Sequence, residues 1–157
     1  MKEHTIEKIV RIRGNSMEPL ISDDVIAFYT VMENYSVGDI VVFEYLQDGG
    51  KRIISHRIIH KEGDQYLCKG DNSFRIEKIT FDEILGKITA ILKNGKRINI
   101  DVKDETIKKY CDLSKKCGEE WQRGNVDEAQ ALGKRCYINM LKLALSLYKA
   151  EMNTECM

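Results

Sequence analysis

The sequence predicts an α+β fold, in which a mostly β domain over residues 1–102 is followed by a helical hairpin over residues 103–157. Two observations support this prediction. Before about residue 103, short runs rich in β-branched residues alternate between apolar and polar positions, which is typical of strands. After it, apolar residues recur every three or four positions, which is typical of amphipathic helices. The 157 residues are enough for one domain with a substantial core and an appendage.

The first two expected strands flank a short turn that contains a serine. Residues 9–13 (Ile-Val-Arg-Ile-Arg) and 25–29 (Val-Ile-Ala-Phe-Tyr) have strand patterns, and residues 14–19 between them hold the only proline of the chain, Pro19. Gly14 allows a close approach of the backbone and Pro19 stiffens the exit. We therefore expect Ser16 at a strand end with its hydroxyl exposed, although an ordinary serine turn explains this short motif equally well.

Two further segments place a histidine and an aspartate at expected strand edges. Ser55-His56-Arg57 lies inside a β-branched run, and residues 69–73 (Lys-Gly-Asp-Asn-Ser) follow later. A lone histidine in a strand is more often a core residue that bonds to the backbone than a catalytic group. Asp71 lies in ordinary turn composition, so it is catalytic only if it pairs with His56.

The C-terminal region predicts two helices, over about residues 104–123 and 126–151, separated by residues 124–128 (Gly-Asn-Val-Asp-Glu). Asn125 or Asp127 is expected near the start of the second helix. The simplest role of the apolar face is packing on the β domain or on a second copy, which would make a homodimer. The alternative is a docking surface for a substrate or partner, with Trp121 and Tyr148 the exposed residues that would serve it.

Four segments in order resemble the boxes of the type I signal peptidases and the self-cleaving repressor proteases, which share a β-rich catalytic fold. Residues 16–19 (Ser-Met-Glu-Pro) resemble the nucleophile box and residues 38–43 (Gly-Asp-Ile-Val-Val-Phe) the central strand box. Residues 70–72 (Gly-Asp-Asn) resemble the third box, and residues 86–88 (Gly-Lys-Ile) the late strand. The resemblance covers about residues 8–92. Asp39 lies within it, but we expect a structural role in its turn.

The resemblance implies a role for each reacting group. Bacterial signal peptidases and the repressor proteases use a lysine as general base, whereas the endoplasmic reticulum and archaeal branch has a histidine at that position, as here. By resemblance, Ser16 is the nucleophile, His56 the general base and Asp71 its partner. The chemistry agrees, because a serine hydroxyl needs a base within hydrogen-bond reach and a carboxylate on the other ring nitrogen orients the imidazole.

The resemblance also implies how a substrate would be held. Met17 and Pro19 are expected to contact it, and an edge strand is expected to accept it as an added strand. Signal peptidases often have a serine two residues before the nucleophile that helps to bind the oxyanion, whereas this chain has Gly14 there. The backbone N–H groups of Asn15 and Ser16 would then form the oxyanion hole, and the enzyme could be slower.

Composition limits the partners and the compartment. The 25 basic and 25 acidic residues give zero formal net charge, which argues against nucleic acid as a partner. The five cysteines are odd in number and lack CxxC spacing, so we expect no disulfide framework, no metal site and a reducing compartment. No cofactor is suggested.

The sequence offers no segment that would anchor the chain in a membrane. Only fifteen residues precede Ser16, and the longest apolar-rich stretch, residues 137–148, is interrupted by Asn139, Lys142 and Ser146. A membrane-spanning helix needs about 20 apolar residues. We therefore expect neither a signal peptide nor a membrane anchor, and a cytoplasmic location.

The sequence thus predicts a serine endopeptidase that cleaves a peptide or protein substrate. Its substrate would be a leader peptide removed during peptide maturation, or a cytoplasmic regulator. Two alternatives stay open. The chain could be a catalytically inactive peptide-binding module on the same fold, or a self-cleaving regulatory switch, although we expect no DNA-binding domain before the protease-like part.

Overall fold

The computed structural model describes residues 6–103 and 105–155, with side chains up to residue 150. It contains eight strands, one short 3₁₀ helix and two α-helices among the described residues. Their bounds are β1 Glu7–Arg11, β2 Ile26–Thr30, β3 Ile40–Gln47, β4 Gly50–Glu62, β5 Gln65–Lys69, β6 Ile76–Thr80, η1 Phe81–Glu83, β7 Ile84–Lys93, β8 Lys96–Asn99, α1 Glu105–Gln122 and α2 Val126–Glu155.

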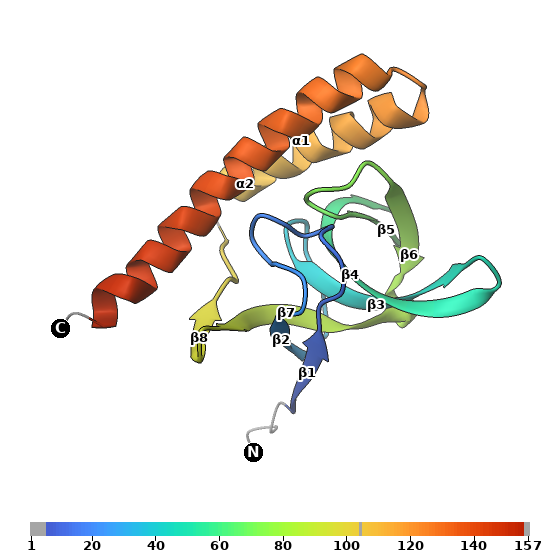
Figure 1. Cartoon of the computed structure of the whole chain (residues 1–157). Coiled ribbons are helices and arrows are strands. Elements are labelled where there is room, and N and C mark those ends of the chain that lie inside the picture. Colours follow the sequence, from blue (N-terminus) through green and yellow to red (C-terminus); the bar gives the residue numbers. More distant parts are fainter. Residues whose placement is uncertain (1–5, 104, 156–157) are drawn as a thin grey trace.

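The strands form one antiparallel sheet in the order β1-β2-β7-β3-β4-β5-β6, and β8 pairs with β7. The sheet is strongly curved, and the two helices lie side by side across one side of it (Figure 1). The predicted α+β fold, mostly β with a C-terminal helical hairpin, is therefore confirmed.

Strand β4 is the longest of the eight and has two differently paired halves. Residues 50–57 pair with β3, whereas β5 pairs only with residues 57–62. Tight turns at Gly49 and Gly63, both with positive φ, join β4 to its neighbours, where a side chain would be strained. The edge of residues 50–56 that faces away from β3 is consequently unpaired among the described strands.

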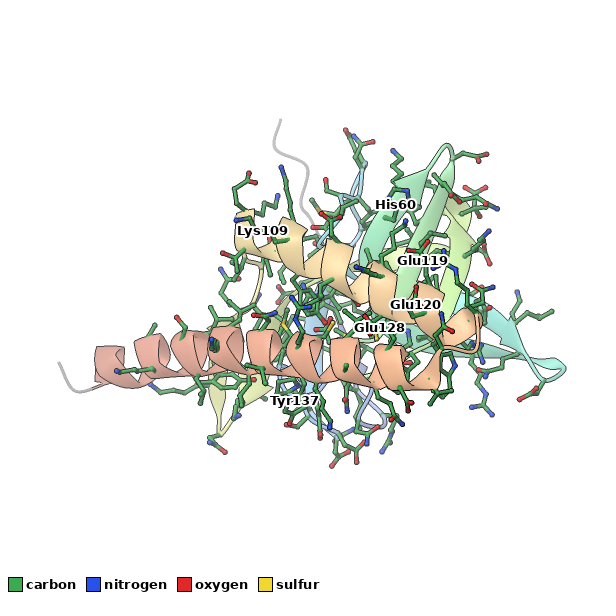
Figure 2. The ribbon with its side chains drawn as sticks, turned by 90° about the horizontal axis from the view of Figure 1, so that it is seen from above. His60, Lys109, Glu119, Glu120, Glu128 and Tyr137 are labelled. Carbon is green, nitrogen blue, oxygen red and sulfur yellow. The ribbon has the colours of Figure 1, made fainter. Side chains whose placement is uncertain are left out.

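The hairpin packs through one face of each helix and exposes the other. Helix α1 buries residues spaced by three, four and seven positions, namely Ile107, Tyr110, Cys111, Ser114, Cys117 and Gly118. Charged side chains such as Lys109, Glu119 and Glu128 project from the outer surface of the two helices (Figure 2). This is the amphipathic pattern that the periodicity predicts.

The helices and the sheet share one hydrophobic core. Leu132 and Met140 of α2 belong to the same buried cluster as Met17 and Ile59 of the β region. A second, smaller cluster contains Phe43 and neighbours on the other side of the sheet. The predicted division at residues 102 and 103 coincides with the linker between β8 and α1, but whether the two parts behave as separate domains stays a prediction.

Neither helix in the described part of the chain is both long enough and apolar enough to cross a membrane.

Candidate active site

Ser16 lies in the loop between β1 and β2, and this loop is fixed from both sides. Gly14, with φ of +86°, donates its N–H to Asp23 Oδ1 over 2.7 Å. Beyond Ser16, the Ile21 N–H bonds to the Met17 carbonyl over 2.9 Å, which makes one tight turn. The apolar side chains of the turn point into the core, while Ser16 stays partly exposed. Ser16 is thus five residues beyond the end of β1 and partly exposed, whereas the sequence analysis expected it at a strand end with its hydroxyl exposed.

His56 lies close enough to Ser16 to act on its hydroxyl. Its Nε2 is 3.1 Å from Ser16 Oγ, and the residue is only 8% exposed. The histidine is on β4, opposite Val41 of β3. A base within this distance can accept the hydroxyl proton, provided that Nε2 carries no hydrogen.

The second nitrogen of His56 contacts Glu77, which the sequence analysis did not single out. The His56 Nδ1 to Glu77 Oε1 distance is 2.6 Å, and Glu77 is 2% exposed. Glu77 on β6 pairs with Cys68 on β5, which pairs with Ile58 of β4, two residues from His56. Because side chains two apart share one face of a strand, this register brings the two groups together.

The expected pairing of Asp71 with His56 is not present, and this corrects the sequence-based assignment. Asp71 accepts two hydrogen bonds from Arg57, from Nε at 2.9 Å and from Nη2 at 2.8 Å. It also accepts one from the Tyr110 hydroxyl of α1 at 3.0 Å. With its carboxylate already held by a buried guanidinium, Asp71 joins the third box to the hairpin and does not orient His56.

Electrostatics around Asp71 agree with a structural ion pair. Burial disfavours the charged form of Arg57, but the charge of Asp71 and its hydrogen bond outweigh this and raise the pKa of Arg57. Burial, followed by the charge of Asp71, raises the pKa of Tyr110 well above its usual value. Both groups therefore stay protonated at ordinary pH and can donate to the Asp71 carboxyl group.

The backbone around Ser16 leaves two donors available. Asn72 closes over this loop from the third box, donating its N–H to the Ser16 carbonyl over 2.7 Å and its side-chain amide to the Asn15 carbonyl over 3.2 Å. Among the described residues, no hydrogen bond uses the N–H of Asn15 or of Ser16. These are the two groups that the sequence analysis assigned to an oxyanion hole.

Close packing holds the loop and the histidine together. A Cβ atom on Gly70 would lie 2.7 Å from the Ser16 carbonyl oxygen and 3.0 Å from His56 Nε2. Only glycine fits at this position, so the glycine of the third box sets the distance between the nucleophile loop and the base.

Met17 and Pro19, the two residues expected to contact substrate, differ in how exposed they are. Met17 is fully buried and its sulfur accepts the Asp71 N–H, so it supports the loop from below and cannot reach a substrate at the surface. Pro19, which follows a cis peptide bond, is partly exposed beside Ser16. Asp39 accepts the Ser36 N–H and pairs with Lys87, which is the structural role expected for it.

A cleft of about 280 Å³ opens at Ser16 and His56. Its walls are the end of β1, residues 10–13, and residues 52–56 of β4. The unpaired edge of β4 therefore lies in the cleft next to the candidate nucleophile. The described residues contain no group of three or more side chains that could hold a metal ion.

A curved β fold with a Ser–His–carboxylate row beside an open strand edge defines a serine-peptidase-like protein. The family comparison agrees: residues 2–89, more than half of the chain, match the model of the Peptidase S24-like family. The chain belongs to this family, and the predicted relationship to the signal peptidase and repressor protease superfamily is confirmed. No curated protein matches the chain.

Proposed function

We propose that the chain is a serine endopeptidase that cleaves an extended peptide segment through Ser16, His56 and Glu77. The family includes inactive members, so evidence for catalysis must come from the site and not from the fold alone. The observation that favours turnover is the unbroken row of contacts from Ser16 Oγ to His56 Nε2 and from His56 Nδ1 to Glu77 Oε1.

The proposed mechanism gives each group a step. Glu77 accepts the hydrogen on Nδ1, which leaves the lone pair of Nε2 toward Ser16. As Ser16 Oγ attacks the peptide carbonyl carbon, its proton passes to His56 Nε2, and the imidazolium is stabilised by the Glu77 carboxylate. The negative oxygen of the tetrahedral intermediate faces the N–H groups of Asn15 and Ser16.

Collapse of the intermediate completes the first half of the reaction. His56 gives its proton to the departing amine, the C–N bond breaks, and the acyl group remains as an ester on Ser16. A water molecule, deprotonated by His56, then attacks the ester, and Ser16 recovers its proton. No cofactor is needed for these steps.

The substrate would lie as an added strand along residues 52–56 of β4. None of the described strands pairs with this edge, which borders the cleft and leads directly to His56. Backbone hydrogen bonds to such an edge select an extended, unfolded segment. A leader peptide or an exposed segment of a regulatory protein is extended in this way. We propose that the substrate is one of these and that it is cleaved inside the cell.

The test is digestion of a synthetic library of peptides of mixed sequence, followed by mass spectrometry of the products. We expect cleavage by the natural chain, a loss of at least about 10³-fold for Ser16→Ala, and full activity for Ser22→Ala. Ser22 is an exposed serine in the same loop and serves as the matched control. Cuts that persist in Ser16→Ala would refute the mechanism.

The same samples distinguish the alternatives. If the intact natural chain cuts no library peptide but loses mass by an internal cut that requires Ser16, it is a self-cleaving switch. If no cut of either kind occurs, the chain is a binding module and our proposal is wrong.

A further inference from the structure

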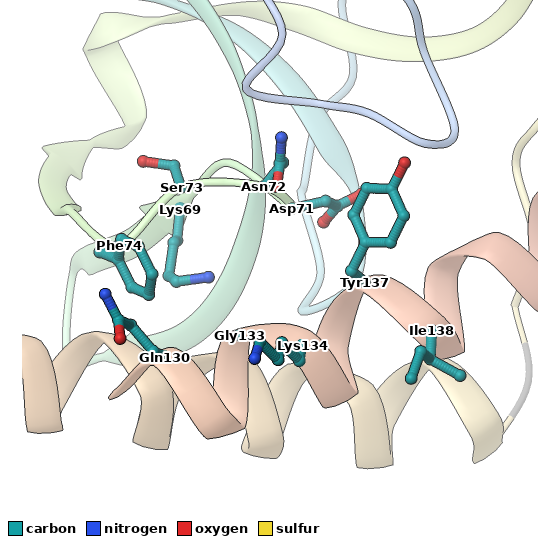
Figure 3. A pocket seen from close by; sticks show the side chains of 10 residues that line it. All are labelled: Lys69, Asp71, Asn72, Ser73, Phe74, Gln130, Gly133, Lys134, Tyr137 and Ile138. Carbon is teal, nitrogen blue, oxygen red and sulfur yellow. The ribbon is translucent and has the colours of Figure 1, made fainter. Parts of the chain in front are cut away.

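A second cavity, of about 610 Å³, lies between the hairpin and the third-box loop (Figure 3). Helix α2 forms one wall with Gly133, Lys134, Tyr137 and Ile138, and the chain from Lys69 to Phe74 forms the other (Figure 3). The matched family region ends at residue 89, so one wall of the cavity comes from a part of the chain outside it.

The floor of this cavity contains a buried positive charge. Lys69 is 1% exposed, and its ammonium group donates to Ser114 Oγ over 2.8 Å and to the Gly70 carbonyl over 3.3 Å. Among the described residues, no carboxylate lies within ion-pair distance of it. Asp71 also lines the cavity, but Arg57 holds its carboxylate. A buried ammonium with two neutral acceptors has one hydrogen left, and an anionic partner for it would offset the cost of burying the charge.

The charge of Lys69 also acts on a neighbouring thiol, that of Cys117. A hydrogen bond from Cys136 lowers the pKa of Cys117, burial opposes this, and the charge of Lys69 adds to the lowering, which brings the pKa to about 7. Its Sγ also donates to the Ala129 carbonyl over 3.3 Å, so this thiol is engaged within the hairpin and is not a dedicated counter-charge for Lys69.

Part of the remaining wall is apolar. Phe74 stacks on Trp121 at the end of α1, with ring centroids 4.5 Å apart and planes at 14°. Ile138 is 53% exposed at the mouth, and Leu141 and Leu145 continue the same stripe three and seven residues further along α2. Lys134 is exposed beside the mouth. The cavity therefore combines positive charge with apolar surface.

The cavity is one loop away from the candidate nucleophile. Asn72 lines it and also donates its N–H to the Ser16 carbonyl. A peptide bound at Ser16 could reach it by passing around this loop, so a contact here is made by a part of the substrate away from the bond that is cut.

We propose that this cavity is a second binding site for the peptide substrate, which accepts a segment where an acidic side chain adjoins a large apolar one. The carboxylate pairs with Lys69 and Lys134, and the apolar side chain packs on Phe74, Tyr137 and Ile138. This inference rests on the proposed peptidase function, because it concerns selection of the same substrate.

The test uses the full chain with Ser16→Ala, so that bound peptide stays intact, and nuclear magnetic resonance of the ¹⁵N-labelled protein. The probes are two pools of N-acetylated, C-amidated octapeptides, one with central Leu-Glu and one with central Leu-Gln, the other positions being mixed. We expect the Glu pool to shift the amide signals of Phe74, Gly133 and Tyr137, with affinity about tenfold higher than the Gln pool. Equal affinities, or no shifts there, would overturn the proposal.

Variants of exposed residues on α2 provide the control. Lys134→Glu should weaken binding of the Glu pool about tenfold, whereas Lys142→Glu, two turns further along and outside the cavity, should leave it within about twofold. Equal losses in both variants would mean that only general surface charge attracts the peptides. If acetate at the same concentration gives the same shifts, the cavity is a simple anion site and the proposal is overturned. If the shifts depend on protein concentration, the occupant is a second copy of the chain and the proposal is overturned as well.

These experiments test the second binding site and the peptidase function separately. A natural chain that cuts library peptides while the Glu pool shows no preference contradicts the second site alone. A chain that cuts nothing contradicts the peptidase function even if the Glu pool binds.

Discussion

His56 contacts a hydroxyl through one ring nitrogen and a carboxylate through the other, and both contacts are within hydrogen-bond distance. The two acidic residues near it have different surroundings. Glu77 meets the imidazole, whereas Asp71 is held by Arg57 and Tyr110. The two carboxylates should therefore differ in what their removal changes: catalysis for Glu77, stability for Asp71.

The first prediction concerns Glu77→Gln. A glutamine can donate to His56 Nδ1 and so favour the tautomer with hydrogen on Nε2, which cannot accept the Ser16 proton. We expect kcat for a library peptide to fall by about 10²- to 10⁴-fold, with KM and the thermal midpoint nearly unchanged. Steady-state kinetics and a thermal melt measure both.

Asp71→Asn is the matched comparison. It leaves the buried Arg57 without its counter-charge, which typically costs about 3–5 kcal/mol in the free energy of unfolding. Urea denaturation should show this loss, while molecules that remain folded keep their kcat within about tenfold. The reverse outcome, an active Glu77→Gln and a stable, inactive Asp71→Asn, would restore Asp71 as the partner of His56.

At the scale of the elements, the hairpin positions the segment that carries Glu77. A Cβ on Gly118 of α1 would lie 2.6 Å from two side-chain atoms of Ile76 and 3.2 Å from the Phe74 carbonyl oxygen. Ile76 directly precedes Glu77 at the start of β6. Helix α1 thus touches the backbone that aims the carboxylate at His56.

The second prediction follows from this contact. Gly118→Ala favours the helix by up to about 1 kcal/mol but forces Ile76 to move, and small displacements of a catalytic group reduce rates strongly. We expect kcat to fall by about tenfold or more while circular dichroism shows unchanged helix content. Gly50→Ala, at a position with open space around it, serves as the control and should keep full activity. An unaltered rate in Gly118→Ala would show that α1 does not position Glu77.

The elements themselves were largely predictable, because strand alternation and helical spacing are local properties. The helices expected near residues 104–123 and 126–151 are Glu105–Gln122 and Val126–Glu155. The partner of His56 was not predictable in this way, since it depends on the register of β4, β5 and β6. One signal was present: Glu77 stands two residues before Ile79 on the inward face of a strand, and a carboxylate among buried apolar residues needs a partner.

Side-chain burial and the packing of the helices account for the other differences between the sequence-based predictions and the structure. Met17 belongs to the segment that resembles the nucleophile box and was expected to contact substrate, but its long apolar side chain is fully buried under the loop. The cavity beside Phe74 depends on how α2 lies over the third-box loop, which no local pattern describes. Tyr148, expected to be exposed, is half-buried and donates its hydroxyl hydrogen to the Leu20 carbonyl, whereas Trp121 is 42% exposed.

At the scale of the whole molecule, the shared core predicts that the sheet and the hairpin unfold together. Trp121 is the only tryptophan and reports on the end of α1. Its fluorescence should change in the same urea transition as the circular dichroism of the whole chain. Leu132→Ala, which opens space in the shared core, should lower both midpoints together, at a cost of about 2–5 kcal/mol. Two separate transitions would show instead that residues 1–102 and 103–157 are independent domains.

The central claim is that His56 and Glu77 activate Ser16 as a nucleophile. A fluorophosphonate tests it without knowledge of the substrate, because an activated serine oxygen bonds to phosphorus and displaces fluoride. Mass spectrometry of the digested chain should find one adduct, on Ser16, and the labelling rate should fall at least about 10²-fold in His56→Ala and in Glu77→Gln. No adduct on Ser16, or a labelling rate that does not depend on His56, would contradict the account.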